Sequence, residues 1–468
     1  MTDDMKNDIS ELLNRVYPGS DLPALTDSVI TAFWPDGPPQ DLATTPAQPL
    51  WSQDDAVLIT YGNSIQDGQF KPLDLLHDFL LQRVTGVFNS VHILPFFPYT
   101  SDDGFAVTDF RKVDGALGDW SDIERIGERF KLMSALVLNH VSSRGIWFTE
   151  FRQGKEPYDG YFFTASPEDD LSRVVRPRTT PLLREVETKS GMQHVWCTFS
   201  HDQIDLDYSN PEVLLEVLRI MRLHIDKGVR VLRLDAVAFL WKEVGTPSIH
   251  MPQTHAIIQL FRLLVNHARE PVVLLTETNV PKAENLSYFG QSNEAHAIYN
   301  FPLPPLILHA MLSGSARYLR SWQAAMPPAP PGCTYLNFTA SHDGIGMRPV
   351  EGLLPEEEIQ RMINAVQAGG GLLSKRALAD GGEAVYEINC GFFPAMARTF
   401  NGEDDWHFKR FMASQTIVMT LEGIPAVYIH PILATPNDHE NVESRGINRA
   451  SHRHRRHHEQ PKSLQHDP

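Results

Sequence analysis

The chain has 468 residues, of which 42% are hydrophobic and 21% charged, so it is long and apolar enough to bury a substantial core. Its 41 Lys and Arg against 58 Asp and Glu give a formal net charge of −17, which argues against binding to nucleic acid or to an anionic membrane surface. Three widely spaced cysteines, Cys197, Cys333 and Cys390, are too few for a disulfide framework or a Cys-based zinc site. The N-terminus has no apolar targeting segment, and we therefore expect a soluble, cytoplasmic protein.

The first fifty residues are predicted to form a small N-terminal segment, a helix and a tether. Apolar residues recur at helical spacing between Ile9 and Val16, which indicates one amphipathic helix. Pro-rich sequence follows from Pro35 to Pro49 and is typical of a tether. Residues 1–50 are assigned to this segment.

From residue 57 onward, short apolar runs alternate with stretches of helical pattern. Continuous apolar strands, covered on both faces, are what a parallel barrel requires. The predicted fold class is therefore α/β, a (β/α)8 TIM barrel formed by residues 51–139 and 201–448, with a doubly wound sheet as the alternative. The eight runs span residues 57–59, 91–94, 136–138, 229–234, 272–276, 297–301, 335–338 and 426–429.

Two connections are too long for ordinary barrel loops, and such insertions usually carry function. The first, after the third strand, predicts an inserted domain over residues 140–200. The second, after the seventh strand, is rich in glycine and predicts a mobile lid over residues 344–400. Residues 449–468 are rich in His and Arg and predict a disordered tail.

Polar residues occur where the predicted strands end, and in such a barrel these ends meet at one rim. Two carboxylates facing one bond, one ionised and one protonated, are the minimal apparatus for cleaving a glycosidic link. Asp235 suits the ionised role because Arg233 lies on the same face of the strand. Glu277, between two uncharged threonines, suits the role of a carboxyl with a raised pKa. A purely structural ion pair of Arg233 with Asp235 is the alternative, but it does not account for Glu277 or for His342-Asp343.

These residues resemble the ordered motifs of glycoside hydrolase family 13, the α-amylase family. The likeness rests on Asn139-His140, Arg233-Leu234-Asp235, Glu277 and His342-Asp343, with Gln203-Ile204-Asp205-Leu206-Asp207 between the first two. It implies Asp235 as nucleophile, Glu277 as acid/base and Asp343 as the carboxylate that binds sugar hydroxyls in the transition state. It also implies that His140 and His342 bind the glucosyl ring and that Arg233 supports Asp235.

Other motifs resemble the sucrose-phosphorylase branch of that family. Leu94-Pro95-Phe96-Phe97-Pro98 and Asp102-Asp103-Gly104-Phe105 look like that branch's closed glucosyl pocket, which implies Asp102 on glucosyl hydroxyls and Phe105 as a stacking platform. Asn279, Phe239 and Glu387 stand where sucrose phosphorylases carry His, Tyr and Gln on the acceptor side. This pattern is most similar to the glucosylglycerate phosphorylases.

The resemblance implies a glycosyltransferase-type phosphorylase that releases α-D-glucose 1-phosphate, with phosphate as co-substrate and no cofactor or metal. Arg178 and Arg348 are the candidate cations for phosphate or for an acceptor carboxylate. Glycerate is the favoured acceptor, whereas fructose and fructose 6-phosphate stay open, and an inactive sugar-binding relic is a second alternative. The expected partners are a small-molecule sugar substrate and phosphate, and neither nucleic acid nor a membrane is expected. A homodimer is compatible with the sequence.

Two departures from the family pattern bear on activity. Ala135 stands where the family carries an Asp, and the absence of that Asp would loosen the site and lower the rate by about tenfold or more. Family members continue after the eighth strand with a helix and a small β domain. Here the sequence turns His/Arg-rich after Asn448, so we expect the C-terminal β domain to be missing.

Overall fold

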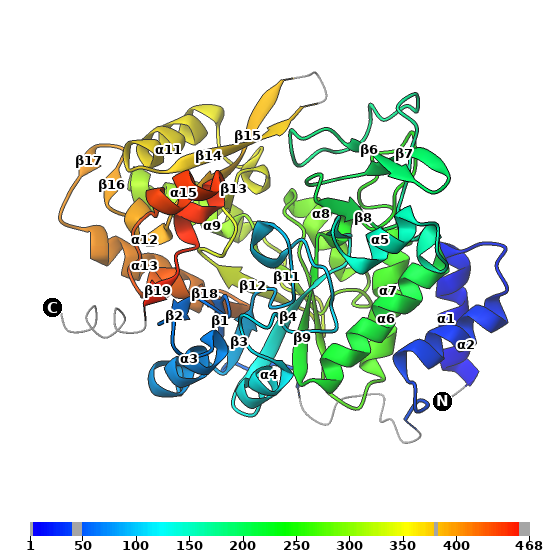
Figure 1. The fold of residues 1–468 in the computed structure, drawn as a ribbon. Helices are drawn as coiled ribbons and strands as arrows, with labels where there is room; N and C mark the ends of the chain where they lie inside the picture. The colour runs from blue at the N-terminus through cyan, green and yellow to red at the C-terminus, as the bar shows by residue number, and fades with distance from the viewer. Residues whose placement is uncertain (1–2, 40–48, 379–381, 458–468) are drawn as a thin grey trace.

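The computed structural model describes residues 3–39, 49–378 and 382–457. Eight parallel strands close into a barrel, with neighbours following chain order around the ring (Figure 1). This confirms the predicted (β/α)8 barrel and excludes the doubly wound sheet, which would be open. The strands are β1 (Val57–Thr60), β3 (Ser90–Ile93), β4 (Lys131–Val137), β9 (Val229–Asp235), β10 (Val273–Thr276), β11 (Ala297–Tyr299), β12 (Thr334–Phe338) and β18 (Ile424–Tyr428).

Helices follow the strands and form the outer layer of the barrel. Several of them begin at a proline, whose missing N–H costs nothing in the first turn of a helix. The outer helices are α3 (Pro72–Phe79), α4 (Trp120–Gly127), α6 (Pro211–Asp226), α7 (Pro252–Asn266), α8 (Lys282–Leu286), α9 (Leu303–Ser313), α10 (Arg317–Ala324) and α13 (His407–Thr420).

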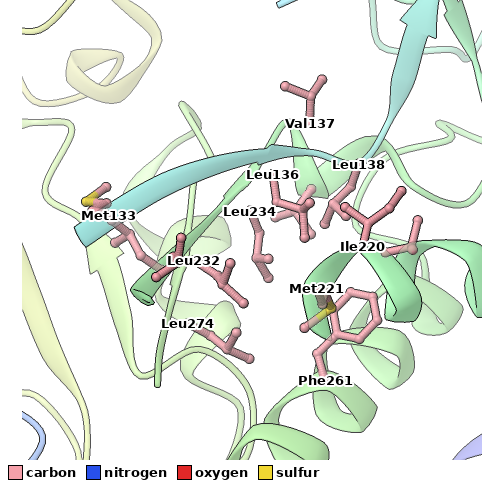
Figure 2. Packing of buried hydrophobic residues seen from close by; sticks show 14 of the residues in the cluster. Met133, Leu136, Val137, Leu138, Ile220, Met221, Leu232, Leu234, Phe261 and Leu274 are labelled. Atoms are coloured by element: carbon pink, nitrogen blue, oxygen red, sulfur yellow. The ribbon is translucent and has the colours of Figure 1, made fainter. Parts of the chain in front are cut away.

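The packing of helices against β9 determines which of its side chains enter the barrel. Figure 2 shows Leu232 and Leu234 of β9 directed toward Met221 of α6 and Phe261 of α7. All four side chains are fully buried. Because successive side chains of a strand point to opposite faces, the residues that alternate with these leucines point into the barrel. Burial of the leucines therefore fixes the direction of the polar residues of β9.

The N-terminal segment contains two helices, not the single one expected. α1 (Asp3–Val16) packs on α7, and α2 (Leu22–Phe33) packs on α6 (Figure 1). Pro23 lies in the first turn of α2, where proline is compatible with a helix. The segment is also tied to the barrel side, because Tyr17 Oη donates to the carbonyl of Tyr208.

The segment between β4 and α6 forms its own small structure above the barrel. β5 (His140–Ser142) pairs antiparallel with β8 (Gln203–Asp205), and β6 (Leu183–Thr188) pairs with β7 (Gly191–Trp196). α5 (Ile146–Arg152) lies between β5 and β6 in the sequence. The pairing of β5 with β8 brings Asp205 back beside His140 at the barrel rim.

The segment between β12 and α13 contains a three-stranded antiparallel sheet in the order β13-β15-β14. Its strands are β13 (Ile345–Gly346), β14 (Leu372–Ala377) and β15 (Glu383–Asn389), with α11 (Glu356–Ala368) between the first two. Apolar side chains of this segment share a second core with α9. The glycines that suggested mobility serve packing at Gly371, where a Cβ atom would lie 2.3 Å from Val366 Cγ1. Gly381 lies outside the described residues.

The prediction of a disordered tail from residue 449 is wrong for residues 449–457. After β18 the chain forms α14 (Ile429–Ile432), α15 (His439–Arg445), a 3-10 turn over Asn448–His452 and a short strand, β19 (Arg456–His457), beside β2 (Ile65–Gln66). Arg453 is fully buried. A His/Arg-rich composition is typical of a solvated tail, but here Arg449 and Arg453 form ion pairs with carboxylates at the barrel rim. Residues 458–468 lie outside the described residues.

Within the described part of the chain, no helix has both the length and the apolarity needed to cross a membrane.

Candidate active site

A cavity of about 720 Å³, counting the space that opens to solvent, lies at the carboxyl ends of the barrel strands. All of the residues proposed from the sequence for catalysis or substrate binding line it, except Arg233. Those lining it are Asp102, Phe105, His140, Arg178, Asp235, Glu277, Asn279, His342, Asp343, Arg348 and Glu387. The strand ends therefore bring together the residues expected to meet there.

Arg233 lies beneath the cavity and contacts Asp235 from within the barrel. Its guanidinium Nη1 is hydrogen-bonded to Asp235 Oδ1, and its Nε donates to Tyr299 Oη at 3.2 Å. The Arg233 side chain is 2% exposed. Ala135 faces Arg233 across the β4–β9 ladder and offers it no carboxylate. The charge of Arg233 is therefore directed at Asp235.

Glu277 is held next to Asp235 by the backbone. Ala236, which follows Asp235, has a φ of 51°, in the left-handed region that costs a non-glycine residue about 1 kcal/mol or more. In this conformation the N–H of Ala236 donates to Glu277 Oε2 at 3.1 Å. Burial raises the pKa of Glu277 to about 7, with a further contribution from Asp235 that Arg233 partly opposes. Glu277 is thus a carboxyl that keeps its proton near neutral pH.

Asp343 differs from Glu277 in that its pKa is lowered, not raised. Arg449 Nη1 lies 2.7 Å from Asp343 Oδ1, and Arg233 Nη2 lies 3.9 Å from its other oxygen. Burial alone would raise the pKa of Asp343, but Arg449, His342 and Arg233 together hold that pKa well below its usual range. Asp343 is therefore ionised at every working pH.

The sequence interpretation missed Arg449, which was placed in the disordered tail. Besides Asp343, this guanidinium binds Glu387, with Nη2 at 2.5 Å from Oε1 and Nε at 3.0 Å from Oε2. The only local signal was that Arg449 immediately follows the end of the family resemblance at Asn448. A pairing across more than a hundred residues leaves no periodic trace in the sequence.

Aromatic and imidazole rings form one wall of the cavity. Phe105 stacks on His342 with ring centroids 4.8 Å apart and planes 3° from parallel. His140 Nε2 lies 3.1 Å from the carbonyl oxygen of Phe105. The loop before Phe105 is tight: Gly104 has a φ of +113°, and a Cβ atom there would lie 2.7 Å from the Pro95 carbonyl oxygen. This glycine lets the loop approach the barrel and place Phe105 against His342.

Arg453 is a second cation that sequence reasoning missed. Its Nη1 lies 2.8 Å from Asp103 Oδ2 and 3.2 Å from Asp102 Oδ1, and its Nε donates to the carbonyl of His342 at 2.9 Å. Asp102 retains 28% exposure of its side chain toward the cavity. The segment that follows α15 thus ties the Asp102 loop to the strand end that carries His342.

The two candidate arginines of the acceptor side have different surroundings. The guanidinium of Arg178 lies over the rings of Tyr386 and Phe199, 5.0 Å and 5.7 Å from their centroids. Among the described residues no carboxylate lies within ion-pair distance of Arg178. Arg348 approaches Glu284 at 4.0 Å. Arg178 Nη1 donates to the Pro177 carbonyl at 3.1 Å, and Arg348 Nε is buried without a hydrogen-bond partner. Arg178 therefore lines the cavity without a carboxylate partner among the described residues, whereas Arg348 has a distant one.

The remaining acceptor-side candidates also line the cavity, but they differ in whether their polar atoms already have partners. Glu387 is 1% exposed and is bound by Arg449, so its carboxylate is already neutralised. Asn279 Oδ1 is buried without a hydrogen-bond partner in the free protein. Phe239 packs edge-on against Phe199, with centroids 5.6 Å apart. Asn279 thus has an unpaired acceptor atom in the wall of the cavity, whereas the Glu387 carboxylate is already paired.

Comparisons with known proteins agree with this geometry. Residues 83–327 match the family model described as the α-amylase catalytic domain. The chain is 46% identical to a glucosylglycerate phosphorylase of Spirochaeta thermophila over 399 residues, covering 85% of this chain and 68% of that protein. It is 39% identical to the glucosylglycerate phosphorylase of Escherichia coli, covering 97% and 81% of the two chains. The structure resembles that of sucrose 6F-phosphate phosphorylase from Thermoanaerobacter thermosaccharolyticum with a TM-score of 0.79 at 25% identity, covering 91% and 86% of the chains.

Proposed function

The chain belongs to the α-amylase family, in its group of glycoside phosphorylases, and we propose that its substrate is glucosylglycerate, which it cleaves with phosphate to α-D-glucose 1-phosphate and glycerate. The observation that carries the chemistry is the pair of neighbouring carboxyls with different environments. Asp235 is paired with a buried arginine, and the pKa of Glu277 is raised to about 7. Such a pair supplies a nucleophile and a proton donor at the same time.

The first half of the reaction breaks the glycosidic bond. A carboxylate oxygen of Asp235 forms a bond to C1 of the glucosyl group while the bond from C1 to the leaving oxygen breaks. Glu277 transfers its proton to that oxygen, which leaves as the hydroxyl of the acceptor. The products of this step are a glucosyl ester on Asp235 and an ionised Glu277.

The second half uses phosphate in place of water. A phosphate oxygen attacks C1 and the ester bond to Asp235 breaks, while Glu277 recovers a proton from the attacking phosphate. Two inversions give net retention, so the product is the α anomer. Asp343, ionised beside Arg449, accepts hydrogen bonds from sugar hydroxyls in both steps.

The Arg178 side of the cavity is cationic, and this supports an acceptor that carries a negative charge. Arg178 lacks a carboxylate partner among the described residues, and its guanidinium presents paired donors suited to a carboxylate or a phosphate. The acceptor leaves before phosphate enters, so one arginine serves both anions in turn. No other co-substrate or metal is part of this proposal.

Phosphorolysis of sucrose or of sucrose 6′-phosphate is the main alternative. The glucosyl half is the same in all three substrates, so Asp102, Phe105 and Asp343 do not distinguish them. Selection falls to the acceptor side, where Arg178 favours an anionic acceptor over neutral fructose. An inactive relic is not favoured, because the Asp235 ion pair and the protonated Glu277 are both retained.

The decisive experiment incubates the purified protein with phosphate and, separately, glucosylglycerate, sucrose and sucrose 6′-phosphate. Glucose 1-phosphate is measured in each. We expect the highest kcat/KM with glucosylglycerate, none without phosphate, and none for Asp235→Asn. Faster release from sucrose would contradict the assigned acceptor, and no release from any substrate would support the relic.

A further inference from the structure

A buried ammonium group lies behind the glucosyl pocket, and the mechanism above does not use it. Lys242 follows the short turn after β9, and its side chain is 1% exposed. The counter-charge is Asp205, whose side chain is fully buried at 3.2 Å from Nζ. A charged pair is rarely buried this deeply unless its remaining bonds are satisfied.

The surroundings of Lys242 Nζ consist of oxygen atoms from three parts of the chain. Asn139 Oδ1 lies at 2.7 Å, the carbonyl of Leu206 at 3.1 Å and the carbonyl of Leu240 at 3.4 Å. These residues follow β4, β8 and β9 respectively. One cation therefore joins the end of a barrel strand, the returning strand of the insertion and the loop after the Asp235 strand.

This arrangement fixes the orientation of the Asn139 amide. An ammonium group only donates hydrogen bonds, so Asn139 must turn its oxygen toward Lys242. Its Nδ2 then faces Asp205 Oδ2 at 2.9 Å and His140 Nδ1 at 3.3 Å. Because the amide nitrogen donates, a neutral His140 accepts at Nδ1 and carries its ring proton on Nε2. Nε2 faces the Phe105 carbonyl, which accepts, at 3.1 Å, and it also lies 3.0 Å from Gln203 Nε2, so this tautomer requires the Gln203 amide to turn its oxygen toward the ring.

We propose that Lys242 is a positioning residue that sets the orientation of Asn139 and, through it, the tautomer and placement of His140 in the glucosyl pocket. The link from Nζ to the imidazole passes through a single side chain. Lys242, Asn139 and His140 are each at most 5% exposed, so bulk water does not compete for the hydrogen bonds between them. The inference rests on the proposed function, since His140 matters only if the pocket binds a glucosyl group.

Removal of the charge should loosen His140 without removing any group that touches the sugar. Lys242→Met keeps the unbranched chain up to the position of Cε but leaves Asp205 and the Asn139 oxygen without their cation. Loss of a residue that orients a binding group typically lowers activity by about 10- to 100-fold. Lys155→Met is the matched control, because Lys155 forms an ion pair of 2.7 Å with Glu150 on the surface of the same insertion.

Fluoride release from α-D-glucosyl fluoride is the appropriate readout. It requires the glucosyl pocket and Asp235 but no particular acceptor, so it reports on Lys242 even if glucosylglycerate proves not to be the substrate. We expect Lys242→Met to lower kcat/KM by at least about tenfold with an increased KM. A purely structural defect would instead reduce the active fraction and leave KM unchanged.

A double-mutant cycle with His140→Ala separates the two readings. If Lys242 acts through His140, Lys242→Met should have little further effect in the His140→Ala background, whereas independent losses add in free energy. In Lys242→Ala, added n-propylammonium matches the four atoms removed and should restore part of kcat/KM, with no such effect on the wild type or on Lys155→Met.

Several outcomes would overturn the proposal. A folded Lys242→Met with the kcat/KM of the wild type would do so, as would additivity with His140→Ala. If Lys242→Met does not fold, Lys242→Arg, which keeps but displaces the charge, is used in the same cycle with the same criterion. A wild-type protein that releases no fluoride would overturn the proposed function and this inference together.

Discussion

Arg449 Nη1 lies 2.7 Å from Asp343 Oδ1, and the same guanidinium binds both carboxylate oxygens of Glu387. One cation thus compensates a buried carboxylate, Glu387, and a partly buried one, Asp343, which come from different parts of the chain. The Arg449 side chain is 14% exposed. This bridge connects the chain end to the β12–α13 segment and keeps Asp343 ionised.

Replacement of Arg449 by Met should therefore damage both stability and activity. Removing one partner of a buried pair leaves the other charge uncompensated, which costs about 3 kcal/mol or more in the free energy of unfolding. The pKa of Asp343 should rise, and kcat/KM for the glucoside should fall by about 100-fold, a loss of roughly 3 kcal/mol. Urea denaturation and steady-state kinetics measure the two effects.

The control for Arg449→Met is Arg398→Met, which removes an ion pair with the exposed Glu403. Surface pairs contribute about 1 kcal/mol at most, so this variant should behave like the wild type. Equal effects of the two substitutions would contradict the role assigned to Arg449.

The pH dependence of glucosyl transfer should show an alkaline limit near pH 7. Glu277 must be protonated to donate to the leaving oxygen, and its pKa is raised to about 7, so kcat/KM for glucosylglycerate should fall about tenfold per pH unit above that value. In double displacement, kcat/KM for the glucoside does not include the phosphate step, and the ionisation of phosphate therefore does not enter. α-D-Glucosyl fluoride, whose leaving group needs no proton, is the control and should retain activity. A flat profile to pH 9 would remove Glu277 from the acid role.

Substitution of the same residue should also stabilise the fold in alkaline solution. The pKa of Glu277 is 4.5 in the unfolded chain and about 7 in the folded protein, so the folded protein binds the proton more tightly. The contribution of Glu277 to the free energy of unfolding is therefore fully present below pH 4.5 and is lost as the pH rises to about 7. Glu277→Gln has no such charge to bury. Its free energy of unfolding should exceed that of the wild type by roughly 1–3 kcal/mol at pH 8 but not at pH 4.5. Thermal unfolding at the two pH values tests this, with exposed Glu403→Gln as the control; a difference independent of pH would contradict it.

The sequence was sufficient to predict the barrel and its rim because both depend on local patterns. Eight apolar runs mark strands buried on both faces, and the residue at the end of such a strand is placed at the rim by the topology alone. Asp235, Glu277 and Asp343 were found in this way. Ion pairs between distant segments follow no period, so Arg449 and Arg453 were assigned to a solvated tail. The cage around Lys242 was missed for the same reason, although Asn139, Asp205 and Leu206 all belong to the motifs quoted from the sequence.

The second N-terminal helix shows a different limit. Leu22–Phe33 has a buried apolar face, but Pro23 near its start resembles a break. Proline disrupts the interior of a helix but is compatible with its first turn, so a proline indicates a helix break at one position and a helix start at another. The start of a helix must be known before its proline can be interpreted, and here that start is marked by Asp21, whose side chain accepts a hydrogen bond from the Ala24 N–H at 3.1 Å.

Arg178 provides the most direct test of the acceptor. Arg178→Leu should lower kcat/KM for glucosylglycerate by about 100-fold, because a charge-assisted bond to a buried carboxylate contributes about 1.5–3 kcal/mol. The kcat/KM for sucrose, whose fructosyl group is neutral, should change by less than about fivefold, since no ionic bond is lost. The kcat/KM for phosphate should fall with either glucoside, because phosphate enters the space that the acceptor leaves. Arg348→Leu is the matched comparison, since Arg348 already has Glu284 as a distant partner at 4.0 Å and should matter less. Equal losses for glucosylglycerate and sucrose in Arg178→Leu, with phosphate unaffected, would show that Arg178 is not the anion-binding residue of this site.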